Sequence, residues 1–282
     1  MGEADTACDF VRGRRLADQL GEIGRSSGDP ALRAAGLAAE GIQRLHEGHV
    51  EDARGHLDEA HALVEATPRA AAPGFAADHR LHTETFRLLV HDLTGADARG
   101  AFEALAARQT DLYSATVVRS FSVTAATAIG DRARAERLTE EAAPTFYDVF
   151  NRMAAGAVAI AGGAVEAGRA VFDGAVARYR GEAGRHSGLG LFLAEAGLAL
   201  LSAGHPEEAA LYVHDARDEL DTYGERWPEP VVLLAEAQLA LVGGAPLATV
   251  LEDLDAAAAL AASQGAHGVA RRIRAAAAAS GP

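Results

Sequence analysis

Small and apolar residues recur along this chain at fixed distances from a series of glycines. Around Gly48, a small residue lies seven positions before the glycine, an alanine five after it, an apolar residue nine after it and another alanine twelve after it. The same positions around Gly204 carry the same kinds of residue. Looser copies surround four more glycines: Gly95, Gly130, Gly163 and Gly244. Because steps of three and four residues are typical of an amphipathic helix, and a glycine often ends one, each copy predicts a helix, a turn and a second helix.

The six glycines are 33 to 47 residues apart, which is the length of a helix–turn–helix repeat. Small residues let the paired helices approach closely, and the glycine ends the first helix with a positive φ. No segment shows sustained alternation of apolar and polar residues with the β-branched residues typical of a strand. The sequence therefore predicts an all-α fold, an α-α superhelix of about six antiparallel helix pairs.

We expect one helical repeat domain over residues 1–282. An N-terminal capping helix lies within residues 1–27, the repeats occupy residues 28–268, and a C-terminal capping helix lies within residues 269–282. Three arginines of this last segment, Arg271, Arg272 and Arg274, suit the last turn of a helix, because cations stabilise the negative end of the helix dipole.

Two segments carry a resemblance to a known family. The order of small residues, glycine, alanine and apolar residue resembles the tetratricopeptide repeat. The segment at residues 27–33 (Ser-Gly-Asp-Pro-Ala-Leu-Arg) and the segment at residues 262–274 resemble the helical repeat region of large ATP-binding, MalT-like transcriptional regulators of the actinobacterial LuxR type. The resemblance implies a regulatory region that lies between an ATPase module and a DNA-binding domain. Neither of those parts is recognisable in the sequence, so we expect a detached sensor-like module or a standalone relative.

Charge and cysteine content narrow the range of partners and compartments. The chain has 40 acidic residues against 26 arginines and no lysine, a net charge of −14. Nucleic acid binding requires a basic surface, so we expect no direct contact of this chain with nucleic acid. The longest uncharged apolar run, residues 154–165, is too short to cross a bilayer, and the first residues lack a signal-peptide pattern. Together with a single cysteine, Cys8, these features predict a cytoplasmic protein without membrane contact.

No motif for catalysis or for a cofactor is recognisable. Ser187 lacks the glycine spacing of a nucleophile elbow, and a phosphate-binding loop of the Walker type requires a lysine. The first repeat contains four histidines: His46, His49, His56 and His61. Because their spacing straddles the turn or points them apart, we interpret them as polar residues of a solvated face and not as metal ligands. We therefore expect no catalytic residue, no cofactor and no metal.

The second and third repeats differ from the others in the residues predicted to face inward. In a superhelix of helix pairs, the first helix of each pair lines the concave surface, which is the usual binding surface. The inward positions of the other repeats are mostly apolar, whereas six in these two repeats are polar: His82, Thr85, Asp92, Ser120, Thr124 and Thr127. Three aromatic residues complete the candidate groove: Phe121, Tyr147 and Phe150. The alternative is that these aromatic side chains only fill the core where the repeat lacks small residues.

These features predict a regulatory module that binds a small molecule, a peptide or a protein in the concave groove. A standalone scaffold for protein–protein interaction is an alternative, and an enzyme built on a helical array is a third. A deep closed pocket would favour ligand sensing, whereas an open apolar channel would favour the scaffold. The sequence is also compatible with a homo-oligomer.

Overall fold

The computed structural model describes residues 9–66, 79–139, 147–181 and 187–280, and these residues contain helices and no strand. The all-α prediction is therefore confirmed for this part of the chain. In chain order the helices are α2 (Phe10–Ser27), α3 (Pro30–His46), α4 (Val50–Ala66), α5 (His79–Thr94), α6 (Arg99–Ala107), α7 (Leu112–Ile129), α8 (Arg132–Thr139), α9 (Asp148–Ala161), α10 (Val165–Gly181), α11 (Leu189–Ser202), α12 (Pro206–Tyr223), α13 (Glu229–Val242), α14 (Leu247–Ser263) and α15 (His267–Ser280). Cys8 lies outside the described residues.

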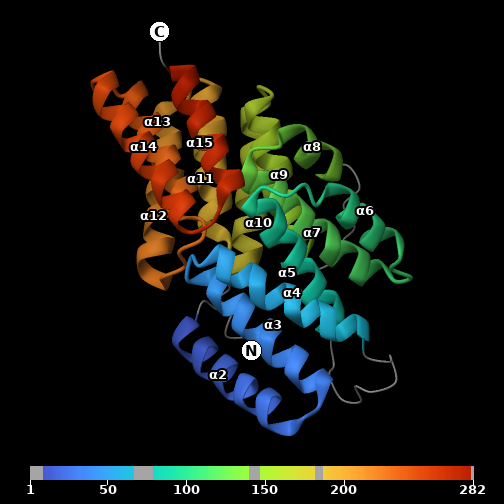
Figure 1. The fold of residues 1–282 in the computed structure, drawn as a ribbon. Coiled ribbons are helices and arrows are strands. Elements are labelled where there is room, and N and C mark those ends of the chain that lie inside the picture. The colour runs from blue at the N-terminus through green and yellow to red at the C-terminus, as the bar shows by residue number, and fades with distance from the viewer. Residues whose placement is uncertain (1–8, 67–78, 140–146, 182–186, 281–282) are drawn as a thin grey trace.

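Consecutive helices pack side by side in pairs (Figure 1). The pairs are α3 with α4, α7 with α8, α9 with α10, α11 with α12, and α13 with α14, whereas α6 packs more on α7 than on α5. Helix α2 lies at one end and packs on α3. The start of α3 shows how the sequence sets these boundaries, because the Asp29 side chain accepts a hydrogen bond from the Ala31 N–H, and Pro30 occupies the first turn.

The turn glycines have the conformation that the repeat predicts. All six, from Gly48 to Gly244, have φ between 76° and 96°. This left-handed region is strained for any residue with a Cβ atom, and glycine enters it without that cost. The prediction that each glycine ends a helix with positive φ is confirmed.

The seam between paired helices also follows the repeat. The small residue seven positions before the turn glycine faces the apolar residue nine positions after it in three pairs: Gly41 with Leu57, Gly156 with Phe172, and Gly197 with Val213. A Cβ atom on any of these glycines would lie 2.6 to 2.9 Å from the facing side chain. Because real Cβ atoms do not approach so closely, only glycine lets these helix pairs reach their observed separation.

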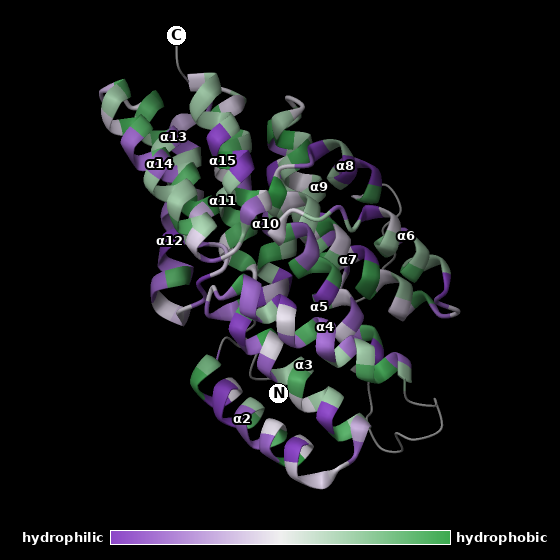
Figure 2. Ribbon diagram, in the orientation of Figure 1, coloured by the Kyte–Doolittle hydropathy of each residue, from purple (hydrophilic) through white to green (hydrophobic). Residues whose placement is uncertain are grey.

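The buried apolar residues form a large cluster that runs from Ala38 in α3 to Ile273 in α15. Figure 2 shows hydrophilic residues on the visible faces of α8 and α12, whereas α11 is predominantly hydrophobic. This distribution agrees with burial, because ten of the fourteen residues of α11 are buried.

Helix α15 packs against helices far from it in the sequence. Besides α13 and α14 it contacts α5 and α7 (Figure 1). A Cβ atom on Gly268 would lie 2.6 Å from the Asp92 carbonyl oxygen at the end of α5, so the two backbones are in direct contact. At the adjacent turn, the Val50 N–H donates a hydrogen bond to the Gln264 carbonyl oxygen over 2.8 Å. The first and last repeats of the described chain therefore touch.

The arginines of α15 do not lie where the sequence predicted them. The helix continues to Ser280, so Arg271, Arg272 and Arg274 lie in its middle, and its last turn contains no basic residue. Two of them instead stabilise the negative ends of other helices. Arg272 Nη1 donates to the carbonyl oxygens of Thr127 (2.9 Å) and Ala128 (3.2 Å) in the last turn of α7, and Arg271 Nη2 donates to Gly95 at the end of α5 (3.4 Å).

We predict that Gly268→Ala destabilises the chain by about 1 to 3 kcal/mol, because a methyl group there overpacks the contact with α5. Gly174→Ala is the matched control, since a Cβ atom at this exposed position of α10 meets nothing within 4 Å. That change removes a flexible residue from a helix and should stabilise the chain by about 0.5 to 1 kcal/mol. Urea unfolding of both variants measures the two effects, and an unchanged Gly268→Ala variant would contradict the close contact.

Candidate functional site

The nine predicted groove residues lie on α5, on α7 and at the start of α9, and most of them are packed inside the molecule. Five of the six polar residues are only 0 to 9 % exposed: Thr85, Asp92, Ser120, Thr124 and Thr127. His82 and the three aromatic residues are half-buried. The role of the nine residues in binding a ligand stays a prediction.

Three hydroxyl groups of this set are satisfied by their own helices. Thr85 donates to the His82 carbonyl oxygen over 3.0 Å, and Thr124 donates to the Ser120 carbonyl oxygen over 2.8 Å. The Ser120 hydroxyl also lies 2.8 Å from the carbonyl oxygen of Tyr147, so it links α7 to the residue before α9. These hydrogen bonds explain how polar side chains remain buried between helices without a ligand.

The aromatic residues fall into two groups. Phe121 packs edge-on against Phe86 of α5, with ring centroids 4.7 Å apart. Phe150 stacks on Tyr147 at 6.4 Å and meets the edge of Tyr179 of α10 at 5.2 Å. All three predicted aromatics pack against the apolar core. This arrangement favours the alternative interpretation, in which they fill the core.

Among the predicted residues, Asp92 forms both an ion pair and a hydrogen bond to a backbone N–H. Its Oδ2 atom lies 2.7 Å from Arg134 Nη1, and its Oδ1 atom accepts the Ala98 N–H over 2.9 Å. Burial raises the pKa of Asp92 above its ordinary value, and the positive charge of Arg134 opposes that rise. A carboxylate held in this way fixes the turn between α5 and α6 and the position of α8.

Sequence reasoning missed Arg134, the partner of Asp92. Its side chain is 3 % exposed, donates to the Ser122 hydroxyl over 2.8 Å and lies over the Phe102 ring at 5.3 Å. The only local signal is an arginine beside the small repeat position Ala135 on a helix rich in arginine. That signal cannot separate a buried arginine from its exposed neighbours.

A second buried network centres on Glu225, in the turn between α12 and α13. Its Oε2 atom accepts the Gly188 N–H over 2.7 Å, and its Oε1 atom accepts the Trp227 indole N–H over 2.9 Å. His46 Nδ1 lies 2.9 Å from Oε1, and the imidazole is only 4 % exposed. The interpretation of His46 as a residue of a solvated face is therefore wrong, because the last turn of α3 is covered by the turns before α11 and α13.

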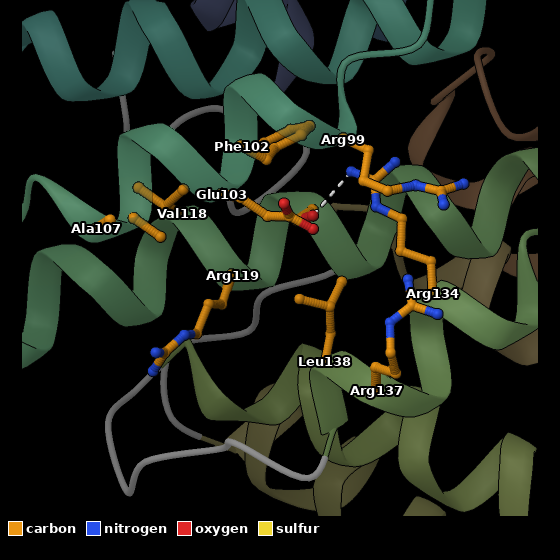
Figure 3. Close-up of a pocket in the computed structure, with 11 residues that line it drawn as sticks. Arg99, Phe102, Glu103, Ala107, Val118, Arg119, Arg134, Arg137 and Leu138 are labelled. Atoms are coloured by element: carbon orange, nitrogen blue, oxygen red, sulfur yellow. Dashed lines mark hydrogen bonds between the residues drawn. The ribbon is translucent and has the colours of Figure 1, made fainter.

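An outer cleft lies between α6 and α8, with α7 beneath it (Figure 3). Its volume is about 340 Å³, within the usual range for small-molecule sites. Four of its eleven lining residues are arginines, namely Arg99, Arg119, Arg134 and Arg137, and one, Glu103, is acidic. None of the nine predicted groove residues lines this cleft. Arg134 nevertheless joins it to Asp92, because the same guanidinium forms part of its wall.

The described residues contain no group of three or more histidine, cysteine or acidic side chains that could hold a metal ion. Among the helices of this part of the chain, none is long and apolar enough to span a membrane. Comparison of the chain with models of protein families, with curated proteins and with solved structures found no match.

We predict that Arg134→Met lowers the free energy of unfolding by about 3 to 5 kcal/mol at neutral pH, because it leaves the buried Asp92 carboxylate without its counter-charge. The folded-state pKa of Asp92 is already raised, so the folded chain binds this proton more tightly than the unfolded chain does. The loss should therefore shrink as the pH falls from about 7.5 to about 5.

The double variant Asp92→Asn/Arg134→Met is the control for this prediction. An asparagine retains an oxygen for the Ala98 N–H but carries no charge, so the double variant should recover most of the lost stability. Chemical unfolding of the wild-type chain, of Arg134→Met, of Asp92→Asn and of the double variant gives the coupling energy. A double variant as unstable as Arg134→Met alone would contradict the charge-pair explanation.

Proposed function

We propose that the chain is a regulatory interaction module, without catalytic activity, built on a superhelix of tetratricopeptide-like helix pairs. Three observations support this proposal: the paired helices, the turn glycines with positive φ, and the glycine seams in three pairs. The resemblance to the repeat region of LuxR-type regulators suggests transcription regulation as the process that it serves. In such an array the inner face of the first helices is the usual binding surface.

The observation that carries the proposal is the packing of α15 on α5 and α7. We call the surface of α5 and α7 that contacts α15 the seat. These are the two helices whose inward polar residues distinguish the second and third repeats. The seat holds a helix by backbone contact at Gly268 and by donation from Arg272 to carbonyl oxygens of α7. Arg272 also forms an ion pair with Glu195 of α11. The surface expected to take a partner is thus complementary to a helix with a glycine and arginines at these positions.

A regulatory module needs two states. Here the two states would be α15 packed on α5 and α7, and α15 displaced from them. We propose that a partner helix competes with α15 for α5 and α7, so that α15 limits access to this face. A constitutive scaffold would differ, because its binding face would be open without displacement. The distinction is measurable, since loosening α15 should raise the affinity for a helix that fits the seat.

The test uses Arg271→Ala/Arg272→Ala in the full chain, with Arg274→Ala of the same helix as the matched control. The probe is a labelled synthetic peptide of residues 264–280. We expect the double variant to bind it at least about tenfold more tightly than the wild-type chain, because the lost hydrogen bonds to α5 and α7 free the seat. Arg274 is exposed, so the control should bind the peptide as the wild type does.

Hydrogen exchange of the α15 amides shows whether the double variant has loosened the helix. If α15 loses protection and the affinity for the peptide stays unchanged, displacement of α15 is not how the face is opened. In cells, transcript levels should change in a strain with the double variant and not in the Arg274→Ala strain at equal protein abundance. Unchanged transcripts in both strains would contradict the regulatory role.

A further inference from the structure

Helix α11 is almost entirely apolar, and its single charged residue is Glu195. The four residues of α11 that are not buried follow one another at steps of three or four along one side of the helix: Glu195, Leu198, Leu201 and Ser202. A carboxylate on a helix of this kind is costly to cover unless a positive charge lies beside it. Whatever covers this side of α11 must therefore supply a cation.

In the closed chain that cation comes from α15. Arg272 forms an ion pair with Glu195, and the two side chains are 15 and 16 % exposed. Arg272 Nη1 also donates to the carbonyl oxygens of Thr127 and Ala128 in the last turn of α7. Carbonyl groups in a last turn lack their regular partners within the helix and lie at the negative end of its dipole. One arginine thus bridges α7 and α11, and all three groups that it meets are acceptors.

A glycine one turn earlier sets how closely this arginine approaches. Gly268 lies four residues before Arg272, so the two residues share one side of α15. A Cβ atom on Gly268 would lie 2.6 Å from the Asp92 carbonyl oxygen and 3.0 Å from that of Leu93. A larger residue would hold the helix away from α5 and withdraw the guanidinium from Glu195. The glycine and the arginine therefore act together.

We propose that Glu195 selects the partner of the seat, by favouring a helix that carries an arginine four residues after a glycine. The proposal rests on the proposed function, in which a partner helix displaces α15 from α5 and α7. A helix without that arginine covers Glu195 and leaves its carboxylate without a counter-charge, which weakens binding. A helix with the arginine restores the ion pair that α15 gives up. Selection thus comes from a penalty against wrong partners as well as from contact with the right one.

The chain contains its own control helix. Arg14 and Arg15 of α2 are the only other pair of adjacent arginines in the sequence. Three positions before this pair stands Val11, where α15 has Gly268. A peptide of residues 10–27 is therefore cationic and contains an arginine pair, but it lacks the glycine at the distance that the seat requires.

Peptide binding to the full chain with Arg271→Ala/Arg272→Ala tests the proposal, because this variant has lost the hydrogen bonds of α15 to α5 and α7. The probes are the labelled peptide of residues 264–280, its Arg272→Gln form and the peptide of residues 10–27. We expect Arg272→Gln in the peptide, or a further Glu195→Gln in the chain, to weaken binding at least about tenfold, the effect of one charge-assisted hydrogen bond. The two changes together should cost little more than Arg272→Gln alone, because both remove the same ion pair. The peptide of residues 10–27 should bind at least about tenfold more weakly than that of residues 264–280.

Glu59→Gln is the matched control for Glu195→Gln. It also removes a carboxylate that pairs with an arginine, Arg33 of α3, and it changes the net charge by the same amount. Peptide binding should not change in this control. In the otherwise wild-type chain, Glu195→Gln should speed hydrogen exchange of the α15 amides, whereas Glu59→Gln should not.

The outcomes separate this proposal from the proposed function. If the peptide of residues 264–280 binds, and Glu195→Gln changes neither its affinity nor the exchange of α15, Glu195 does not select the partner and the displacement of α15 still stands. If the peptide of residues 10–27 binds equally tightly, the seat accepts any cationic helix, and selection is likewise overturned. If the peptide of residues 264–280 does not bind the Arg271→Ala/Arg272→Ala chain, the displacement itself is wrong, and the selection of a partner with it.

Discussion

The closed arrangement of this chain depends on one buried carboxylate, that of Glu225. It receives the backbone N–H of Gly188 and the indole N–H of Trp227, and it meets His46 at the end of α3. A carboxylate that is 3 % exposed is costly to bury unless its oxygens are fully hydrogen-bonded. Since its donors come from three turns that are distant in the sequence, the oxygens are satisfied only when those turns meet. The charge therefore specifies a position for each of them.

Two further hydrogen bonds connect the turns around Glu225 to the turn before α15. The Arg226 N–H donates to the His46 carbonyl oxygen over 2.8 Å, and Gln264 Nε2 donates to the Arg226 carbonyl oxygen over 3.0 Å. The last turn of α3 and the turns before α13 and α15 are thereby joined by one backbone hydrogen bond and one hydrogen bond from a side chain to the backbone. From this junction α15 runs across the ends of α5 and α7, and its glycine and arginines meet their carbonyl groups. The ends of α5 and α7 are thereby covered by the chain itself.

The parts that sequence analysis predicted are those determined by residues close together in the chain. The helix pairs, the turn glycines and the seams depend on spacings of up to 16 residues, such as that between Gly41 and Leu57. The candidate site was harder, because its polar residues have remote partners. Asp92 and Arg134 are 42 residues apart, and His46 and Glu225 are 179 apart. A polar residue predicted to face inward has the same pattern whether it meets a ligand or an ion-pair partner, and only the packing of the helices distinguishes the two. Trp227, the only tryptophan of the chain, is the one local sign of the second network.

The covering of α5 and α7 by α15 also determines the order in which the chain can fold. A stack in which each repeat touches only its neighbours can nucleate anywhere and grow from either side. Here the carbonyl groups at the ends of α5 and α7 acquire their contacts with Gly268 and Arg272 only after residues 267–280 have left the ribosome. Closing the long loop between α5 and α15 carries an entropic cost before the contacts of α15 form. Such non-local pairing slows folding relative to ordinary helical arrays. Newly made chains thus pass through a stage in which most helices can form while the surface under α15 stays exposed to solvent and to other molecules.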